Sequence, residues 1–244
     1  MSPRPYDLGR RRDLIDETRR RVIDAARALL AESTTYTDFT VDAVARRADV
    51  ARATVYYQFG SKTGVLEALC DSLAEAGQMS ELASIFTEPD PRQALRAFIA
   101  AFAHFWASDR LVMRRLRALA ALDPDVAIVI EARDERNRTG LQILVDRIAK
   151  QSNATSPLDG ATVVQVLHTL TSFETFDSLA GATQEPTEVV PLVVELAEAA
   201  LARWPAAPAR GARAKSSQED VTSARPANQR HRASRLIGPD ESSK

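Results

Sequence analysis

The chain has 244 residues, 45% of them hydrophobic, which is enough to bury a sizeable core in one large or two small domains. No apolar run approaches the roughly 18 residues that span a bilayer, and the charged N-terminus lacks the apolar core of a signal peptide. We therefore expect a cytoplasmic protein with no membrane partner. The single cysteine, Cys70, excludes an internal disulfide framework. With only three histidines beside it, we expect no structural zinc site.

The formal net charge of −1 at first argues against a nucleic-acid partner, because Lys and Arg drive the binding of phosphates. The charges are unevenly distributed, however. Residues 1–62 contain twelve Lys and Arg against nine Asp and Glu, so this segment is net +3 and the rest of the chain is net −4. This imbalance alone favours DNA binding only modestly.

The N-terminal part of the chain changes character at about residue 16. Two prolines, a glycine and the run Arg10-Arg11-Arg12 predict a flexible basic arm over 1–15, which is either simply solvated or touches DNA beside the main site. Apolar residues then recur at helical spacing, which predicts an amphipathic helix over 16–33.

Two short helices follow. Thr40 is placed to cap a helix that runs to about Arg47, because its hydroxyl can accept an otherwise unsatisfied backbone N–H. Another helix is expected from Ala51 to Phe59, where Gly60 and Ser61 end it and begin the next one. Two helices of this length with a short connection form a helix-turn-helix, so we predict a three-helix DNA-binding domain over 16–62.

Beyond Ser61 the pattern predicts long helices, and no alternating strand pattern competes with them. The fold class is therefore all-α, with a larger helical domain over 63–204. After Trp204 large apolar residues almost disappear until Leu236, which predicts a disordered tail over 205–244. Proline, glycine and polar clusters divide the helical domain into segments at 62–80, 92–107, 109–122, 125–151, 159–182 and 187–204.

The helix predicted over 51–59 has the parts that reading a DNA major groove requires. Arg52 and Thr54 lie on its outward side, and Arg52 could donate two hydrogen bonds to a guanine. Small alanines beside them allow a close approach, while the following polar residues and the start of the preceding helix could hold phosphates. The candidate DNA-binding residues are Thr40, Ala51, Arg52, Ala53, Thr54, Tyr56, Tyr57, Gln58 and Lys62.

The stretch TVDAVARRADVARATVYYQFGSK, residues 40–62, resembles the DNA-binding domain of the TetR family of repressors. The family pattern is a threonine that opens the second helix, then Ala-Gly-Val-Ser-x-Gly-Thr-Leu-Tyr-x-x-Phe and a Ser-Lys pair. The chain departs from it at Asp49, Ala51 and Ala53. Asp49 can still adopt the left-handed turn conformation, but the missing Ser hydroxyl at Ala51 costs about 1 kcal/mol of helix stability unless Asp49 caps the helix instead. The residues that match are Ala48, Val50, Thr54, Tyr56, Phe59, Ser61 and Lys62, with Val55 in place of leucine.

The resemblance implies a small-molecule effector of unknown identity that binds among the later helices and releases the DNA. A concentration of aromatic residues fits an apolar pocket, although the helical spacing of Phe98, Phe102 and Phe105 is also typical of plain core. His104 is a further polar candidate. The candidate pocket residues are Phe98, Phe102, Phe105, Trp106, Met113, Arg117, His168, Thr171, Phe173, Glu174, Phe176 and Asp177.

The last two predicted helices point to a homodimer. Apolar residues surround most of the final helix, so one face can pack on its own domain while another needs a partner. A two-fold arrangement of this kind suits a palindromic double-stranded operator. The candidate interface residues are Val163, Val166, Leu167, Leu170, Val189, Val193, Leu196 and Ala200.

No nucleophile motif, phosphate loop or paired-histidine helix is present, so the sequence predicts no enzyme, no catalytic or metal site and no cofactor. The leading hypothesis is a ligand-responsive dimeric repressor. The alternative is a protein of the same fold whose head no longer reads DNA and which binds a protein or sequesters a ligand. Asp42, near the DNA-facing start of the second helix, and the weak net charge favour that alternative.

Overall fold

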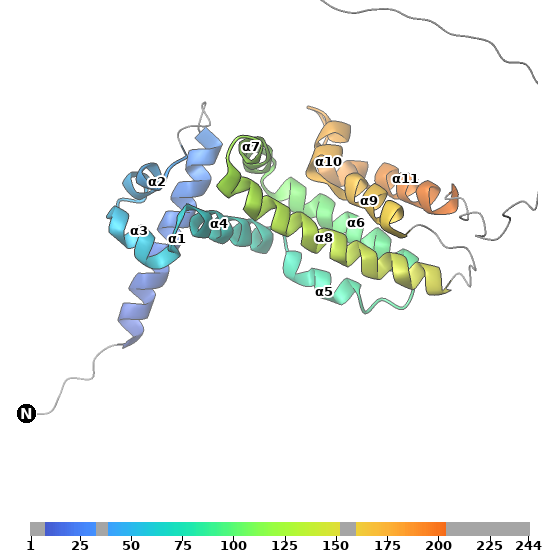
Figure 1. The fold of residues 1–244 in the computed structure, drawn as a ribbon, viewed down its shortest axis with the longest axis horizontal. Coiled ribbons are helices and arrows are strands. Elements are labelled where there is room, and N and C mark those ends of the chain that lie inside the picture. Colours follow the sequence, from blue (N-terminus) through green and yellow to red (C-terminus); the bar gives the residue numbers. More distant parts are fainter. Residues whose placement is uncertain (1–7, 33–38, 152–159, 204–244) are drawn as a thin grey trace, which may run out of the picture. The chain divides into compact units, whose positions relative to one another are not determined.

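The computed structural model describes residues 8–32, 39–151 and 160–203, which all lie in one unit, Met1–Ala207 (Figure 1). The described residues form helices and turns without a strand, as the all-α prediction requires. The predicted tail at 205–244 and the first residues of the predicted arm lie outside them. The helices are α1 (Leu8–Glu32), α2 (Val41–Arg47), α3 (Arg52–Phe59), α4 (Lys62–Ala76), η2 (Met79–Glu81), α5 (Leu82–Ile85), α6 (Pro91–Ser108), α7 (Arg110–Ala120), α8 (Pro124–Gln151), α9 (Gly160–Thr171), α10 (Phe173–Ala180), η3 (Pro186–Val189) and α11 (Val190–Arg203).

Local signals define the ends of the short helices. The Thr40 hydroxyl accepts the N–H of Ala43 at 3.1 Å and so caps α2. Gly60 ends α3 with a φ of 74°, and the Ser61 hydroxyl caps α4 by accepting the N–H of Gly64 at 3.1 Å. Asp49 holds the turn between α2 and α3 with a φ of 52°. The helix-turn-helix prediction is confirmed.

Helix α1 differs from its prediction, because it begins at Leu8 instead of residue 16. The prediction of a flexible arm as far as residue 15 is therefore wrong for residues 8–15, which continue the helix.

The later helices follow their predicted ranges with two differences. The helix expected over 159–182 is divided at Ser172, whose backbone is extended and whose hydroxyl accepts the N–H of Thr175 at 3.3 Å. The helix expected to reach residue 80 ends at Ala76, and the short helix α5 follows. Gly77 lies against α6 so closely that a Cβ there would be 2.6 Å from Phe105 Cδ2, so the chain needs glycine at this point.

Helices α4 and α7 connect the N-terminal helices to the rest of the core. Each of them packs against both α1 and α8, as Figure 1 also shows. Helix α8 packs in turn against α6 and α9, and α11 packs against α6 and α9. Movement of α4 or α7 therefore reaches both the helix-turn-helix and the larger helical region.

Within the described helices, none is long and apolar enough to cross a membrane. Nor do the described residues bring three His, Cys, Asp or Glu side chains together in a way that could hold a metal ion.

Candidate DNA-binding surface and internal cavity

Most of the predicted DNA-binding residues lie on the accessible side of α3. Ala51, Ala53 and Arg52 are exposed, and Tyr57 is the most exposed large side chain of this helix, at 84%. Tyr56 is 40% exposed. Val55 is buried on the opposite side and anchors the helix in the core. The side of α3 that carries Arg52 is therefore free to enter a groove.

Arg52 is held by two neighbours on this surface. Its Nε lies 3.1 Å from Asp42 Oδ1, and its Nη2 donates to the Tyr56 hydroxyl at 3.2 Å. The guanidinium carbon also lies 5.3 Å from the centroid of the Tyr56 ring. More than half of each charged side chain stays exposed, 60% for Arg52 and 53% for Asp42, so water still reaches the pair.

Thr54 and Gln58 are half-buried, and Thr40 is exposed with its hydroxyl oxygen already engaged as the cap of α2. At the N-terminus of α3 the backbone of Ala51 is extended and no side chain caps the helix. Asp49 does not supply the cap. Its nearest charged partner is Arg21 at 3.6 Å, and its own side chain is fully exposed.

Lys62 makes contacts within the fold that its motif does not predict. Its ammonium pairs with Asp123, just before α8, and lies 5.9 Å from the centroid of the Phe39 ring. Burial alone would raise the pKa of Asp123. The hydrogen bond and the positive charge of Lys62 outweigh this effect, so the pKa lies below its ordinary value. The charge of Lys62 thus holds α4 to the start of α8, and its contact with a DNA phosphate stays a prediction.

A cavity of about 470 Å³ lies among α4, α6, α7 and α8, and Met79, Leu82 and Phe86 line it from η2, α5 and the residue after α5. Aromatic rings of α6 form one wall: the rings of Phe98 and Phe102 lie 4.7 Å apart, and those of Phe102 and Trp106 5.9 Å apart. The predicted pocket residues that line it are Phe98, Phe102, Phe105, Trp106, Met113 and Arg117.

The other predicted pocket residues lie elsewhere. Four are buried in the core behind this wall, and Thr171 is fully buried, where its carbonyl accepts the Trp106 indole N–H at 2.9 Å. Asp177 binds Arg110 at 2.6 Å and Arg114 at 2.7 Å instead of facing the cavity. The residues to which this correction applies are His168, Thr171, Phe173, Glu174, Phe176 and Asp177, and the further candidate His104 is exposed and also outside the cavity.

Helices α4 and α8 supply cavity residues that the sequence analysis did not select. Cys70 lines the cavity from α4, and burial raises the pKa of its thiol, which disfavours the reactive thiolate. Ile130, Asn137 and Gly140 line it from α8. Their spacing of three to seven residues places them on one helical face, which is a signal that could have identified this wall.

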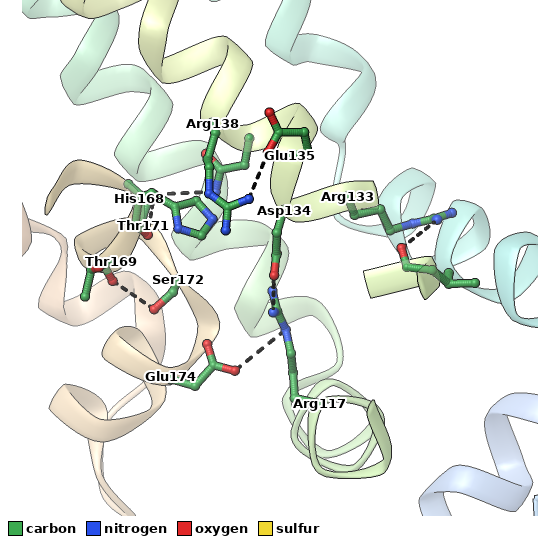
Figure 2. A network of polar contacts seen from close by, with 12 residues as sticks. Arg117, Arg133, Asp134, Glu135, Arg138, His168, Thr169, Thr171, Ser172 and Glu174 are labelled. Carbon is green, nitrogen blue, oxygen red and sulfur yellow. Dashed lines mark hydrogen bonds and ion pairs between the residues drawn. The ribbon is translucent and has the colours of Figure 1, made fainter. Parts of the chain in front are cut away.

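Two ion pairs lie at the edge of the cavity. Arg117 on α7 donates to both carboxylate oxygens of Asp134 on α8, each at 2.8 Å, and Glu174 lies on its other side at 3.8 Å (Figure 2). Arg133 pairs with Asp71 of α4 at 2.6 Å. These pairs connect α8 to α7 and α4 around the cavity.

The predicted dimer residues divide into two groups. Val163, Leu167, Val189 and Val193 are at most 6% exposed and lie in the core of their own chain, so they have no surface to offer a partner. The remaining four are accessible, and Leu196 is 41% exposed. The accessible group consists of Val166, Leu170, Leu196 and Ala200.

Comparisons with known proteins agree with this geometry. Residues 22–69 match the family model described as bacterial regulatory proteins, tetR family. No curated protein matches the chain.

Three solved structures illustrate the shared fold. A TetR transcription regulator from Haloarcula marismortui is 18% identical, with a TM-score of 0.56 over 76% of this chain and 96% of its own. A protein from Saccharomonospora viridis in complex with choline is 19% identical, with a TM-score of 0.56 over 75% and 96%. The transcriptional regulator FadR from Bacillus subtilis, in complex with stearoyl-CoA, is also 19% identical, with a TM-score of 0.56 over 73% and 96%. Residues 22–69 thus resemble the tetR family of bacterial regulatory proteins, and the chain shares the fold of a solved TetR transcription regulator.

Proposed function

We propose that this chain is a dimeric, ligand-responsive repressor that binds a palindromic operator and leaves it when a small hydrophobic effector fills the cavity. One observation carries the proposal. The helix-turn-helix and the aromatic cavity are connected by the same two helices, since α4 and α7 both line the cavity and both pack against α1.

The exposed side of α3 is proposed to read the operator. Arg52 and Thr54 would contact bases in the major groove, while Thr40, Tyr56 and Tyr57 would contact phosphates. The exposure of Arg52 and of Tyr57 supports these roles.

A dimer is proposed to form through α9 and α11, which pack side by side within the chain. On α11, Leu192 is 44% exposed and Leu196 41% exposed, and Ala200 continues the same stripe four residues later. Val166 and Leu170 form a half-buried stripe on α9. Joining these stripes across a two-fold axis would cover exposed leucines and set two α3 helices on one DNA duplex.

Helix α7 is the proposed switch element. Met113, Leu116 and Arg117 face the cavity from α7. At the start of the same helix, Asp109 binds Arg27 of α1 at 2.5 Å. A ligand that displaces the cavity side of α7 would therefore pull on α1 and change the orientation of α3. The complexes of the same fold with choline and with stearoyl-CoA support the binding of small molecules by such a chain.

Selection of bound DNA from a random pool tests the proposal. We expect a recovered site with two inverted half-sites, because a two-fold dimer presents two copies of α3. Arg52→Ala should relax the preference at one base pair per half-site by about 1–3 kcal/mol. Arg96→Ala is the matched control, because Arg96 is also an exposed arginine but pairs with Glu198 on α11, away from α3.

The alternative, a ligand-binding protein that no longer reads DNA, is favoured by the Asp42–Arg52 pair, since it occupies the main base-reading side chain. DNA binding that is indifferent to Arg52 and Tyr56, with no recovered consensus, would support this alternative and contradict the repressor proposal.

A further inference from the structure

The charged side chains around the cavity are almost completely paired. Five of them line it, and four form two ion pairs: Arg117–Asp134, shown in Figure 2, and Arg133–Asp71. The fifth, Arg136, forms no ion pair within the described part of the chain, and the residues three and four positions away on α8 carry no carboxylate. The cavity therefore has one uncommitted positive charge and no uncommitted negative charge.

Arg136 lies at the opening of the cavity. It is exposed, as are the lining residues Thr139 and Ile143, which follow it on the same stripe of α8. The lining residue Asp71 on α4 is also exposed, so the opening lies between α8 and α4. An anion bound by Arg136 would remain near water while the rest of the ligand enters the cavity.

The neighbouring residue on α8 has an unsatisfied polar atom. Asn137 is only 7% exposed and lines the cavity, and its amide nitrogen lies 3.5 Å from the Thr171 hydroxyl. Its Oδ1 is buried without a hydrogen-bond partner. A buried acceptor of this kind is costly until a donor reaches it, so a ligand with one hydroxyl or N–H group would gain from binding here.

We propose that the effector is an amphipathic carboxylate. Its apolar body would lie against Phe98 and Phe102, its carboxylate would pair with Arg136, and one hydrogen-bond donor would reach Asn137. This inference rests on the proposed function, in which the cavity is the effector site. Adjacent residues of a helix point in different directions, and Arg136 is exposed while Asn137 is buried, so the donor belongs on the inserted body of the ligand, away from the carboxylate. A cationic ligand fits poorly, since both lining carboxylates are already neutralised by arginine.

Calorimetry with three naphthalene probes tests this chemistry. The probe 6-hydroxy-2-naphthoate carries both polar groups at opposite ends of the ring system, 2-naphthoate carries only the anion, and 2-naphthol carries only the donor. We expect the first to bind tightest. Arg136→Gln should lower the affinity for both carboxylates by about fivefold to tenfold, as expected for the loss of a charge-assisted contact. The same substitution should leave the affinity for 2-naphthol unchanged within about twofold.

Two controls make the result specific. Arg92→Gln removes an exposed arginine that lies on α6 outside the cavity, and it should leave all three affinities unchanged. Asn137→Leu should weaken the binding of 6-hydroxy-2-naphthoate and of 2-naphthol but not that of 2-naphthoate, and its thermal unfolding would show that the variant is folded.

The inference is overturned if neither carboxylate binds, if 2-naphthol binds as well as 6-hydroxy-2-naphthoate, or if Arg136→Gln weakens the binding of 2-naphthol as strongly as that of the acids. Operator binding measured on the same samples separates this failure from that of the proposed function. Protein that binds its operator and ignores the carboxylates contradicts the effector class only, whereas protein that selects no operator contradicts the repressor proposal.

Discussion

Replacing Asp42 by Asn should strengthen operator binding, because Arg52 must leave Asp42 before it can donate to a guanine. Both side chains of this pair are more than half exposed, and exposed ion pairs contribute about 0.2–1 kcal/mol. Releasing Arg52 in advance is therefore expected to raise the affinity by about 1.5-fold to fivefold. Loss of a carboxylate that faces DNA phosphates acts in the same direction.

Fluorescence anisotropy of a labelled operator measures this change. The advantage of Asp42→Asn should shrink as salt rises, because salt screens an exposed pair. Asp146→Asn is the control, since Asp146 is an exposed aspartate on α8 that accepts a hydrogen bond from Gln142 of the same helix. If Asp42→Asn instead weakens binding while the control does not, Asp42 orients Arg52 for the base and the reasoning about competition is refuted.

Two further changes test local features of the fold. Ala51→Ser places a hydroxyl at the uncapped N-terminus of α3 and should raise the free energy of unfolding in urea by about 1 kcal/mol. An equal gain from Ala53→Ser, at the second residue of the helix, would contradict this explanation. His168 is buried, and burial lowers its pKa from the ordinary 6.5. The unfolded chain therefore takes up a proton first as pH falls below 6.5, and stability is lost. His168→Leu should flatten this loss in thermal unfolding between about pH 7.5 and 5, and an unchanged slope would show that another group is responsible.

The helix-turn-helix could be predicted from the sequence because its signals act over a few residues. Thr40 and Ser61 cap their helices through N–H groups three positions later, and Gly60 needs no partner to adopt a positive φ. The exposed side of α3 follows in the same way, since Val55 fixes which side of the helix is buried.

The cavity was harder to predict, because its walls come from segments distant in sequence: α4, the η2–α5 region, α6, α7 and α8. Aromatic residues mark core and pocket equally, so Phe176, fully buried behind the wall, could not be told from Phe102, which lines it. The dimer residues show the same limit. On a helix that is apolar all round, periodicity does not decide that Val193 faces its own core while Leu196 faces outward.

Which charged side chains form ion pairs also depends on contacts between residues that are distant in sequence. Basic and acidic residues are nearly equal in number, 32 and 33, so most cations can find an internal partner once the chain folds. Lys62 stands in a motif typical of phosphate contacts, yet Asp123, sixty-one residues later, neutralises it. Arg52 is paired but exposed, so binding can still recruit it at a small cost. Arg136 has no counterion among the described residues and lies beside an apolar cavity. The basic residues proposed to act on ligands are therefore identified by the pairs that the fold leaves open or weak, and a count of charges or a motif match does not distinguish them.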